Sequence, residues 1–128
     1  MLPIVLDKGA MDKGVDQLIL CDPSLKPLFN AYDLPELKIE KNYFWTLCRS
    51  IIYQQISGKA ASTIANRFLE LFPSGKNIRA IDIIEINIDK LHSVGLSKQK
   101  ASYIKNIADA FSSGELNVEN YYTMNDEE

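Results

Sequence analysis

Apolar residues recur at helical spacing along most of this chain. The clearest run is NYFWTLCRSIIYQQ at residues 42–55, where positions i, i+3, i+4, i+7, i+8 and i+11 form one face of a helix. These positions hold Phe44, Leu47, Cys48, Ile51, Ile52 and Gln55. Gln55 therefore stands where the pattern predicts a hydrophobic residue, and a second glutamine, Gln54, precedes it.

The same spacing predicts further helices on both sides of this run. We expect helices over residues 11–22, 23–32 and 58–72, short helices or turns over residues 78–86 and 88–95, and a further helix over residues 98–114. Ser57 and Ser97 are suitable N-caps for two of them, and Gly114 is suitable as the residue that terminates the last. No segment has a convincing strand pattern. The sequence therefore predicts an all-α fold, a helical bundle.

The composition agrees with one globular domain or part of one. The chain has 128 residues, of which 46% are hydrophobic, and this is enough for a packed core. We expect a single, partial helical domain over residues 1–128, with a possible N-terminal extension at residues 1–10. No apolar run approaches the length of a membrane span.

The residues that commonly bind metals are scattered. Cys21 and Cys48 form no CxxC motif and no Cys/His cluster, so we expect two buried thiols in a reducing compartment, without a metal site or a disulfide. We interpret the lone His92 as a surface or capping residue rather than a ligand.

The charges are distributed unevenly along the chain. The formal net charge is −3, but residues 41–105 hold ten basic and four acidic residues, which gives this middle segment +6 and the remainder −9. A basic middle is compatible with a nucleic-acid surface. The alternative is an ordinary solvated face.

Two predicted helix starts carry cations in the first turn, where a helix dipole favours acids. Lys59 follows Ser57, and Lys98 and Lys100 follow Ser97. An anion near these starts would reverse the unfavourable interaction, because the free N–H groups and the lysines would then face the same charge. The alternative is that these lysines only extend into water.

The glutamine pair has two interpretations. An amide at a helix end can cap neighbouring backbone groups. Two amides in a row, followed by a Ser-capped helix and a lysine, also suit insertion into a DNA duplex, because an amide offers a donor and an acceptor to any base edge.

Two segments resemble a known family. YFWTLCRSIIYQQISGKAASTIANRFLELF and IDKLHSVGLSKQKASYIKNIADAF, with CDPSL upstream, are similar to the 3-methyladenine DNA glycosylase II group of the helix-hairpin-helix DNA glycosylases. The resemblance covers roughly residues 18–128. It implies an enzyme without a cofactor that flips an alkylated purine such as 3-methyladenine out of double-stranded DNA and hydrolyses its N-glycosidic bond. In this family the segment that matches Gln54 and Gln55 enters the duplex as a wedge. The DNA-binding residues expected from the resemblance and the lysine pattern are Gln54, Gln55, Ile56, Ser57, Lys59, Lys98 and Lys100.

The chain also departs from the family pattern. An LPGIG-like hairpin and a catalytic aspartate some twenty residues after it should follow TMNDEE, residues 123–128, and they are absent. Asp126 stands before the hairpin would begin, so no catalytic residue is assigned. We therefore expect the N-terminal portion of a glycosylase, truncated before the hairpin and inactive by itself. TMNDEE has the caps and acids of a helix start; the alternative is a frayed acidic tail.

Two other functions remain open from the sequence. One is a noncatalytic helical DNA-binding module that retains the wedge, and the other is a protein-interaction bundle. The leading hypothesis implies damaged double-stranded DNA as the partner, a monomer when full length, and a location in the cytoplasm or nucleoid, or in the nucleus of a eukaryote.

Overall fold

The computed structural model describes residues 6–38, 40–121 and 123–125, and within these ranges it contains helices and no strand. The predicted all-α fold is therefore confirmed. The chain divides into two compact units, residues 1–39 and 40–128, which we describe separately. The single domain over residues 1–128 stays a prediction.

The first unit consists of two helices and a connector. Helix α1 spans Lys8–Cys21, a 3-10 turn spans Pro23–Leu25, and α2 spans Lys26–Ala31. Helix α1 begins earlier than predicted, because the side chain of Asp7 accepts a hydrogen bond from Ala10 N at 2.8 Å and caps the helix. Pro27 lies in the first turn of α2, where its missing N–H costs nothing.

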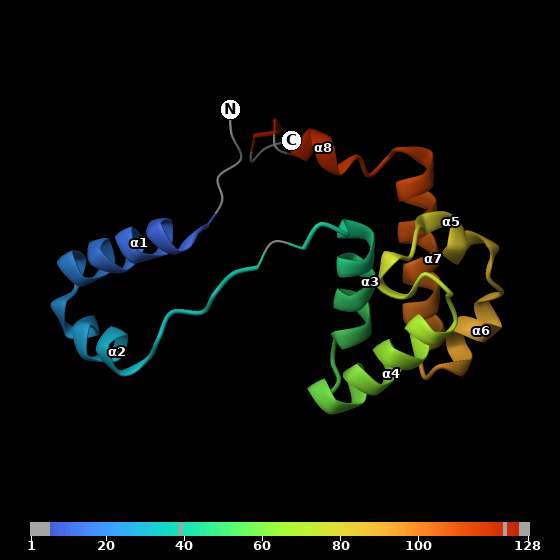
Figure 1. The fold of residues 1–128 in the computed structure, drawn as a ribbon, viewed down its shortest axis with the longest axis horizontal. Helices are drawn as coiled ribbons and strands as arrows, with labels where there is room; N and C mark the ends of the chain where they lie inside the picture. Colours follow the sequence, from blue (N-terminus) through green and yellow to red (C-terminus); the bar gives the residue numbers. More distant parts are fainter. Residues whose placement is uncertain (1–5, 39, 122, 126–128) are drawn as a thin grey trace. The chain divides into compact units, whose positions relative to one another are not determined.

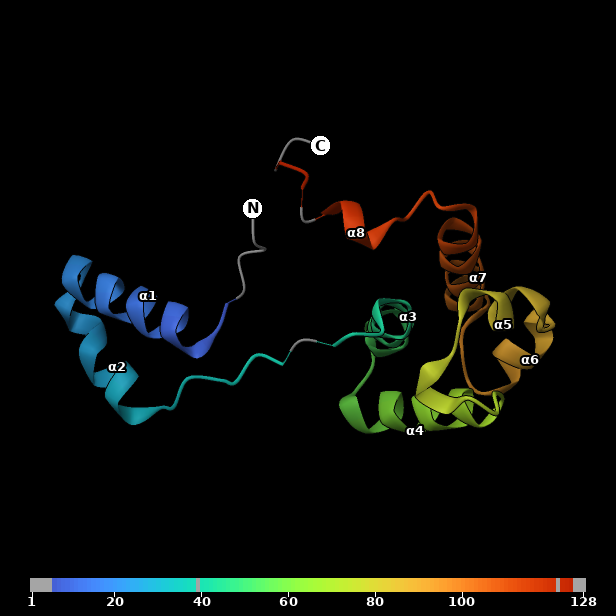
Figure 2. The ribbon, with the colours of Figure 1, turned by 45° about the horizontal axis from the view of Figure 1, so that its top comes forward.

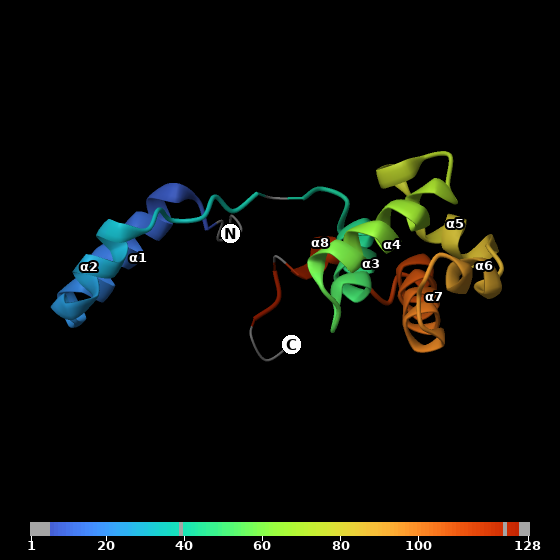
Figure 3. The ribbon, with the colours of Figure 1, turned by 90° about the horizontal axis from the view of Figure 1, so that it is seen from below.

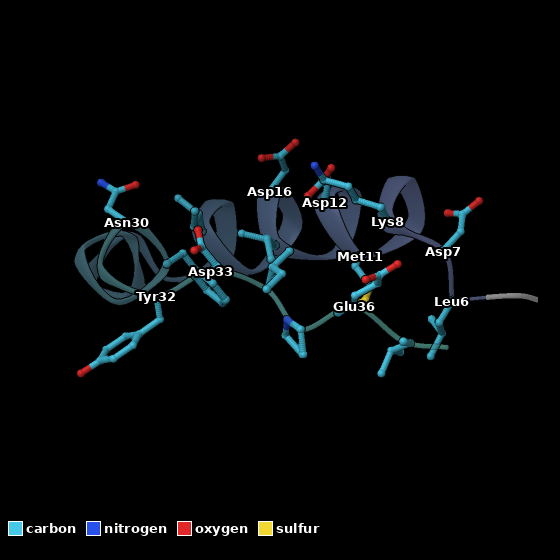
Figure 4. Close-up of a pocket in the computed structure, with 16 residues that line it drawn as sticks. Leu6, Asp7, Lys8, Met11, Asp12, Asp16, Asn30, Tyr32, Asp33 and Glu36 are labelled. Carbon is cyan, nitrogen blue, oxygen red and sulfur yellow. The ribbon is translucent and has the colours of Figure 1, made fainter. Parts of the chain in front are cut away.

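The first unit has no buried side chain among its described residues. A hollow of about 980 Å³ lies between α1, α2 and the connector. Figure 4 shows Met11 on the side of α1 that faces the connector, and Asp12 and Asp16 on the opposite side. The apolar side chains of the first unit are half-buried at best, so this unit does not form a core of its own.

The second unit contains the hydrophobic core. Helices α3 (Tyr43–Tyr53), α4 (Gly58–Glu70), α5 (Ala80–Glu85), α6 (Ile88–Ser93), α7 (Lys98–Ser113) and α8 (Val118–Tyr121) follow one another, with a 3-10 turn at Gly75–Asn77. Helix α7 packs against α3, α5 and α6, while α4 packs against α3 (Figure 1; Figure 2). The long helix α7 is therefore the centre of this unit.

The core is built from the predicted apolar faces with some exceptions. Ile52, Phe68 and Ile104 are completely buried. Leu47 was expected in the core and is 40% exposed, whereas Trp45 is 7% exposed. Trp45 is buried because its ring stacks on Phe68 of α4, with ring centroids 5.8 Å apart. The core thus covers a wider part of α3 than the single stripe predicted.

The ends of α7 agree with the prediction. Ser97 Oγ accepts a hydrogen bond from Lys100 N at 3.1 Å, and Gly114 adopts the left-handed conformation with φ +80° after the last turn. Helix α8 was not predicted. The helix start expected at residues 123–128 falls partly on residues 126–128, which lie outside the described residues.

The prediction of two buried thiols was half wrong. Cys48 is buried, but Cys21 is exposed at the end of α1, and both are free. Burial raises the pKa of the Cys48 thiol to about 12. No helix in the described ranges is long and apolar enough to cross a membrane.

This difference between the two thiols predicts a reactivity test. At pH 8 we expect a coloured disulfide reagent to modify Cys21 quickly and Cys48 only after unfolding, because the thiolate is the reacting species and Cys48 stays protonated. The measurement is the number of thiols that react with and without denaturant, and Cys21→Ser is the control. Two fast thiols in the folded chain would contradict the burial of Cys48.

Candidate nucleic-acid interface

The two glutamines lie in a turn and not in the helix, contrary to the sequence prediction. Helix α3 ends at Tyr53, Gln54 is its C-cap with φ −67° and ψ 134°, and Gln55 has φ +58°. Gln55 therefore leaves the apolar face, because the chain reverses at this residue. Gln54, Gln55 and Ile56 are all exposed, Ile56 by 39%.

The amide side chains of this turn are free for a partner. Among the described residues, neither Gln54 nor Gln55 has a side-chain hydrogen bond, and the only backbone bond made by the Gln54 N–H goes to Ile51 O at 3.3 Å. The interpretation of these amides as caps of α3 therefore has no support in the structure. A left-handed conformation at a residue other than glycine costs about 1–2 kcal/mol, so something else must hold the turn.

That support comes from Lys100, in the first turn of α7. Its Nζ donates to Ile52 O at 3.0 Å and to Gln54 O at 2.6 Å. These are carbonyls at the C-terminal end of α3, which lack a partner within the helix and attract a cation. The sequence pattern predicted Lys100 at a phosphate and gave no indication of this contact. No sequence pattern relates a lysine to carbonyls 46 and 48 residues away.

The same contact brings the two predicted helix starts together. The turn of residues 54–57 leads directly into α4, where Ser57 Oγ accepts from Ala60 N at 3.3 Å as predicted. Because Lys100 reaches Gln54 O, the start of α7 lies beside this turn (Figure 3). Neither first turn contains an acid. We call residues 54–59 and 97–100 the turn site.

The remaining lysines of the turn site are open to a ligand. Lys59 and Lys98 are exposed, and neither has an ion-pair partner in the part of the chain that the structure describes. Exposed lysines beside two helix N-termini can attract an anion such as a phosphate group. The turn site thus combines free amides, an exposed isoleucine and unpaired cations.

A metal site and a catalytic carboxylate are not assigned. No group of three His, Cys, Asp or Glu side chains in the described ranges could hold a metal ion. His92 is exposed, as a surface residue is expected to be, and its Nδ1 lies 2.5 Å from Leu96 O, so this ring contacts the backbone of the loop before α7. Asp126 lies outside the described residues.

Comparison with known proteins supports the resemblance. Residues 48–126 match the model of the HhH-GPD superfamily base excision DNA repair proteins. A crystal structure of DNA-3-methyladenine glycosidase from Bacillus halodurans is similar, with a TM-score of 0.70 and 28% identity, over 84% of this chain and 49% of that one. The chain thus spans about half the length of that protein. No curated protein matches it.

The matched segment contains the turn site and more than half of the chain. The chain therefore belongs to the helix-hairpin-helix (HhH-GPD) superfamily of base excision DNA repair proteins.

Proposed function

We propose that this chain is part of a DNA glycosylase that hydrolyses the N-glycosidic bond of alkylated purines, 3-methyladenine among them. The family match and the similarity to a DNA-3-methyladenine glycosidase support this proposal. The substrate is double-stranded DNA that contains damaged bases, so the protein acts in the nucleoid or in a nucleus. We further propose that the complete protein acts as a monomer and needs no cofactor.

The observation that carries the proposal is the turn of residues 54–56. A glycosylase must rotate the target nucleotide out of the duplex, which costs a few kcal/mol of stacking and pairing. Gln54 and Gln55 place two amides at the tip of a sharp turn, and these amides have no hydrogen-bond partner among the residues that the structure describes. Inserted into the duplex, they fill the vacated space and bond the orphaned base, while Ile56 supplies apolar contact.

The helix starts beside this turn supply contacts to the backbone. The first-turn N–H groups of α4 and α7, together with Lys59 and Lys98, form an electropositive surface. Phosphate contacts hold the duplex in register and carry no sequence information. This fits an enzyme that must recognise a damaged base in any sequence.

The chemical step needs a carboxylate, which stabilises the positive charge that develops on the sugar while water displaces the base. No carboxylate of residues 1–128 is assigned to this role. We therefore propose that this polypeptide alone does not release 3-methyladenine from alkylated DNA. The test compares residues 1–128 with the same chain extended through the codons that follow codon 128. Activity of the short chain would refute its inactivity, and inactivity of an extended chain that folds and contains the hairpin and aspartate would refute the glycosylase.

Binding of DNA by the turn site predicts a defined salt dependence. Replacing Lys59 or Lys98 by Gln should weaken binding to all duplex sequences alike. It should also flatten the slope of log affinity against log salt by about 0.9 for each phosphate group that the variant no longer neutralises. The measurement is fluorescence anisotropy of a labelled duplex between low and moderate salt.

Lys76→Gln is the matched control, because it removes the same charge at the opposite end of α3, where Lys76 O accepts from Asn42 Nδ2 at 2.8 Å. An equally flattened slope in all three variants would show a general charge effect and no defined site. If the unchanged chain does not bind DNA even at low salt, the alternative of a protein-interaction bundle is favoured. Binding without excision by the extended chain favours the noncatalytic DNA-binding module.

A further inference from the structure

Two lysines of α7 stabilise the ends of other helices. Lys100 Nζ donates to Ile52 O and Gln54 O at the end of α3. Five residues later, Lys105 Nζ donates to Ile83 O at 2.6 Å, to Ile84 O at 3.0 Å and to Ile86 O, at the end of α5. Both side chains are half-buried. The two lysines have the same local role, but only one of them lies beside the turn site.

We propose that Lys100 is a positioning residue of the glycosylase: it holds the turn of residues 54–56 in the conformation that presents the two amides to the duplex. The part of this inference that concerns DNA, the presentation of the amides to the duplex, rests on the proposed function. Its structural part, that Lys100 fixes the turn, stands on the hydrogen bonds alone.

The geometry of the turn supports this role. Gln55 is the one residue other than glycine with positive φ in the described ranges, and such a conformation persists only where its surroundings enforce it. Lys100 bonds the carbonyl of Gln54, directly before the strained residue, and the carbonyl of Ile52, within the last turn of α3. It thereby fixes the direction in which the chain leaves the helix. Ser57, two residues after Gln55, fixes the other end by capping α4.

The charge of Lys100 is also already engaged. An ammonium group has three donors, and two of them are directed at these carbonyls. Lys59 and Lys98, in contrast, are exposed and have no such bond within the described part of the chain. The proposal therefore replaces the phosphate contact expected for Lys100 and leaves phosphate binding to the other two lysines.

The experiment compares Lys100→Met with Lys105→Met. Both changes remove an ammonium group that bonds helix carbonyls and keep an unbranched apolar stem, so they change the net charge equally. Lys105→Met loses three such bonds and Lys100→Met two, so the control is expected to disturb stability at least as much as the test variant. A duplex with 2-aminopurine at the target position reports unstacking when the protein saturates it. We expect Lys100→Met to reduce the fluorescence increase at least about fivefold, because it removes two hydrogen bonds to the end of α3 and the loss of one alone corresponds to a factor of about five. Lys105→Met should retain the fluorescence increase.

A second readout does not require DNA. In ¹H–¹⁵N spectra we expect the amide signals of Gln54, Gln55 and Ile56 to shift or broaden in Lys100→Met and to stay in place in Lys105→Met. Lys100→Arg retains a cationic donor and should restore both readouts at least in part. If Lys100→Met does not fold, the arginine variant still tests the proposal. To the extent that its amide signals at residues 54–56 differ from those of the unchanged chain, its fluorescence increase should be smaller.

The outcomes separate this proposal from the function on which it rests. Unchanged turn signals in Lys100→Met, or full unstacking by this variant, would overturn the positioning role. A salt slope flattened by the amount expected for one phosphate, with normal unstacking, would assign Lys100 to the DNA backbone and also overturn it. If the unchanged chain itself binds no DNA while the turn signals still depend on Lys100, the proposed function fails and the structural role survives.

Discussion

Alanine at both Gln54 and Gln55 is expected to lower excision of 3-methyladenine from fully paired DNA at least about tenfold, and to lower excision from single-stranded or mismatched DNA much less. The difference is expected because the proposed wedge would offset the cost of unstacking and unpairing, which is a few kcal/mol in a paired duplex and smaller where the base is already unpaired. About 1.4 kcal/mol of this energy corresponds to the tenfold change.

The measurement is the single-turnover rate on the three substrates, with the chain extended beyond residue 128 as the enzyme. Gln17→Ala on α1, also an exposed glutamine, is the control for removal of an amide elsewhere. Equal reductions on all substrates would identify the turn as a structural element and would contradict its role as a wedge.

Two single substitutions separate the amide from the turn that carries it. Gln55→Gly relieves the cost of φ +58° but removes the amide, and Gln55→Asn keeps an amide on a residue that tolerates the left-handed conformation. If the amide matters, the glycine variant resembles the double alanine variant in excision although it folds at least as well. If only the turn matters, the glycine variant remains active.

Much of the helical framework could be predicted from the sequence, because local signals determine it. Ser57 and Ser97 cap the helices that they were expected to cap, and Ala61, Phe68 and Ile104 are buried on the expected faces. Such signals act within a few residues of the chain and are visible in the sequence pattern.

The sequence predictions that were wrong concern contacts between segments that are distant in the sequence. The apolar stripe appeared to continue to Gln55, but the chain leaves α3 after Tyr53, and Lys100, 46 residues after Gln54, bonds the end of the helix. Trp45 lies outside the stripe and is buried by its stacking on Phe68 of another helix. Hydrophobic periodicity describes one face of one helix, and it carries no information about neighbours on other faces.

The predicted site was limited in the same way, because the sequence pattern does not reveal contacts between distant segments. The glutamine pair and the lysines were found because their types are unusual at helix ends, and the structure places the start of α7 beside the turn. Their assignment to DNA contacts stays a prediction. What the sequence did not separate is a lysine that faces solvent, such as Lys98, from one that bonds carbonyls, such as Lys100.

Gly95 is expected to be the most sensitive glycine in the second unit, because it joins α6 to α7 in a conformation that other residues rarely adopt. Its φ is +110°, and a Cβ atom at this position would lie 3.0 Å from Ile64 Cγ1 and 3.4 Å from Ile64 Cδ1. Ile64 lies on α4, so this loop passes directly against the helix that follows the turn site. Two residues later Ser97 caps α7, which begins at Lys98.

We therefore expect Gly95→Ala to lower the free energy of unfolding by about 2–4 kcal/mol, as the sum of backbone strain and overpacking. Gly58→Ala is the matched control: its new methyl group meets nothing within 4 Å, and alanine is the better residue in a helix. Chemical denaturation of the two variants provides the comparison, and similar midpoints would contradict the close contact with Ile64. Because this loop leads into the turn site, we expect the DNA affinity of Gly95→Ala, relative to that of the unchanged chain, to be lower than the loss of folded protein alone explains. If the relative affinity equals the folded fraction, Gly95 affects only the stability of the fold.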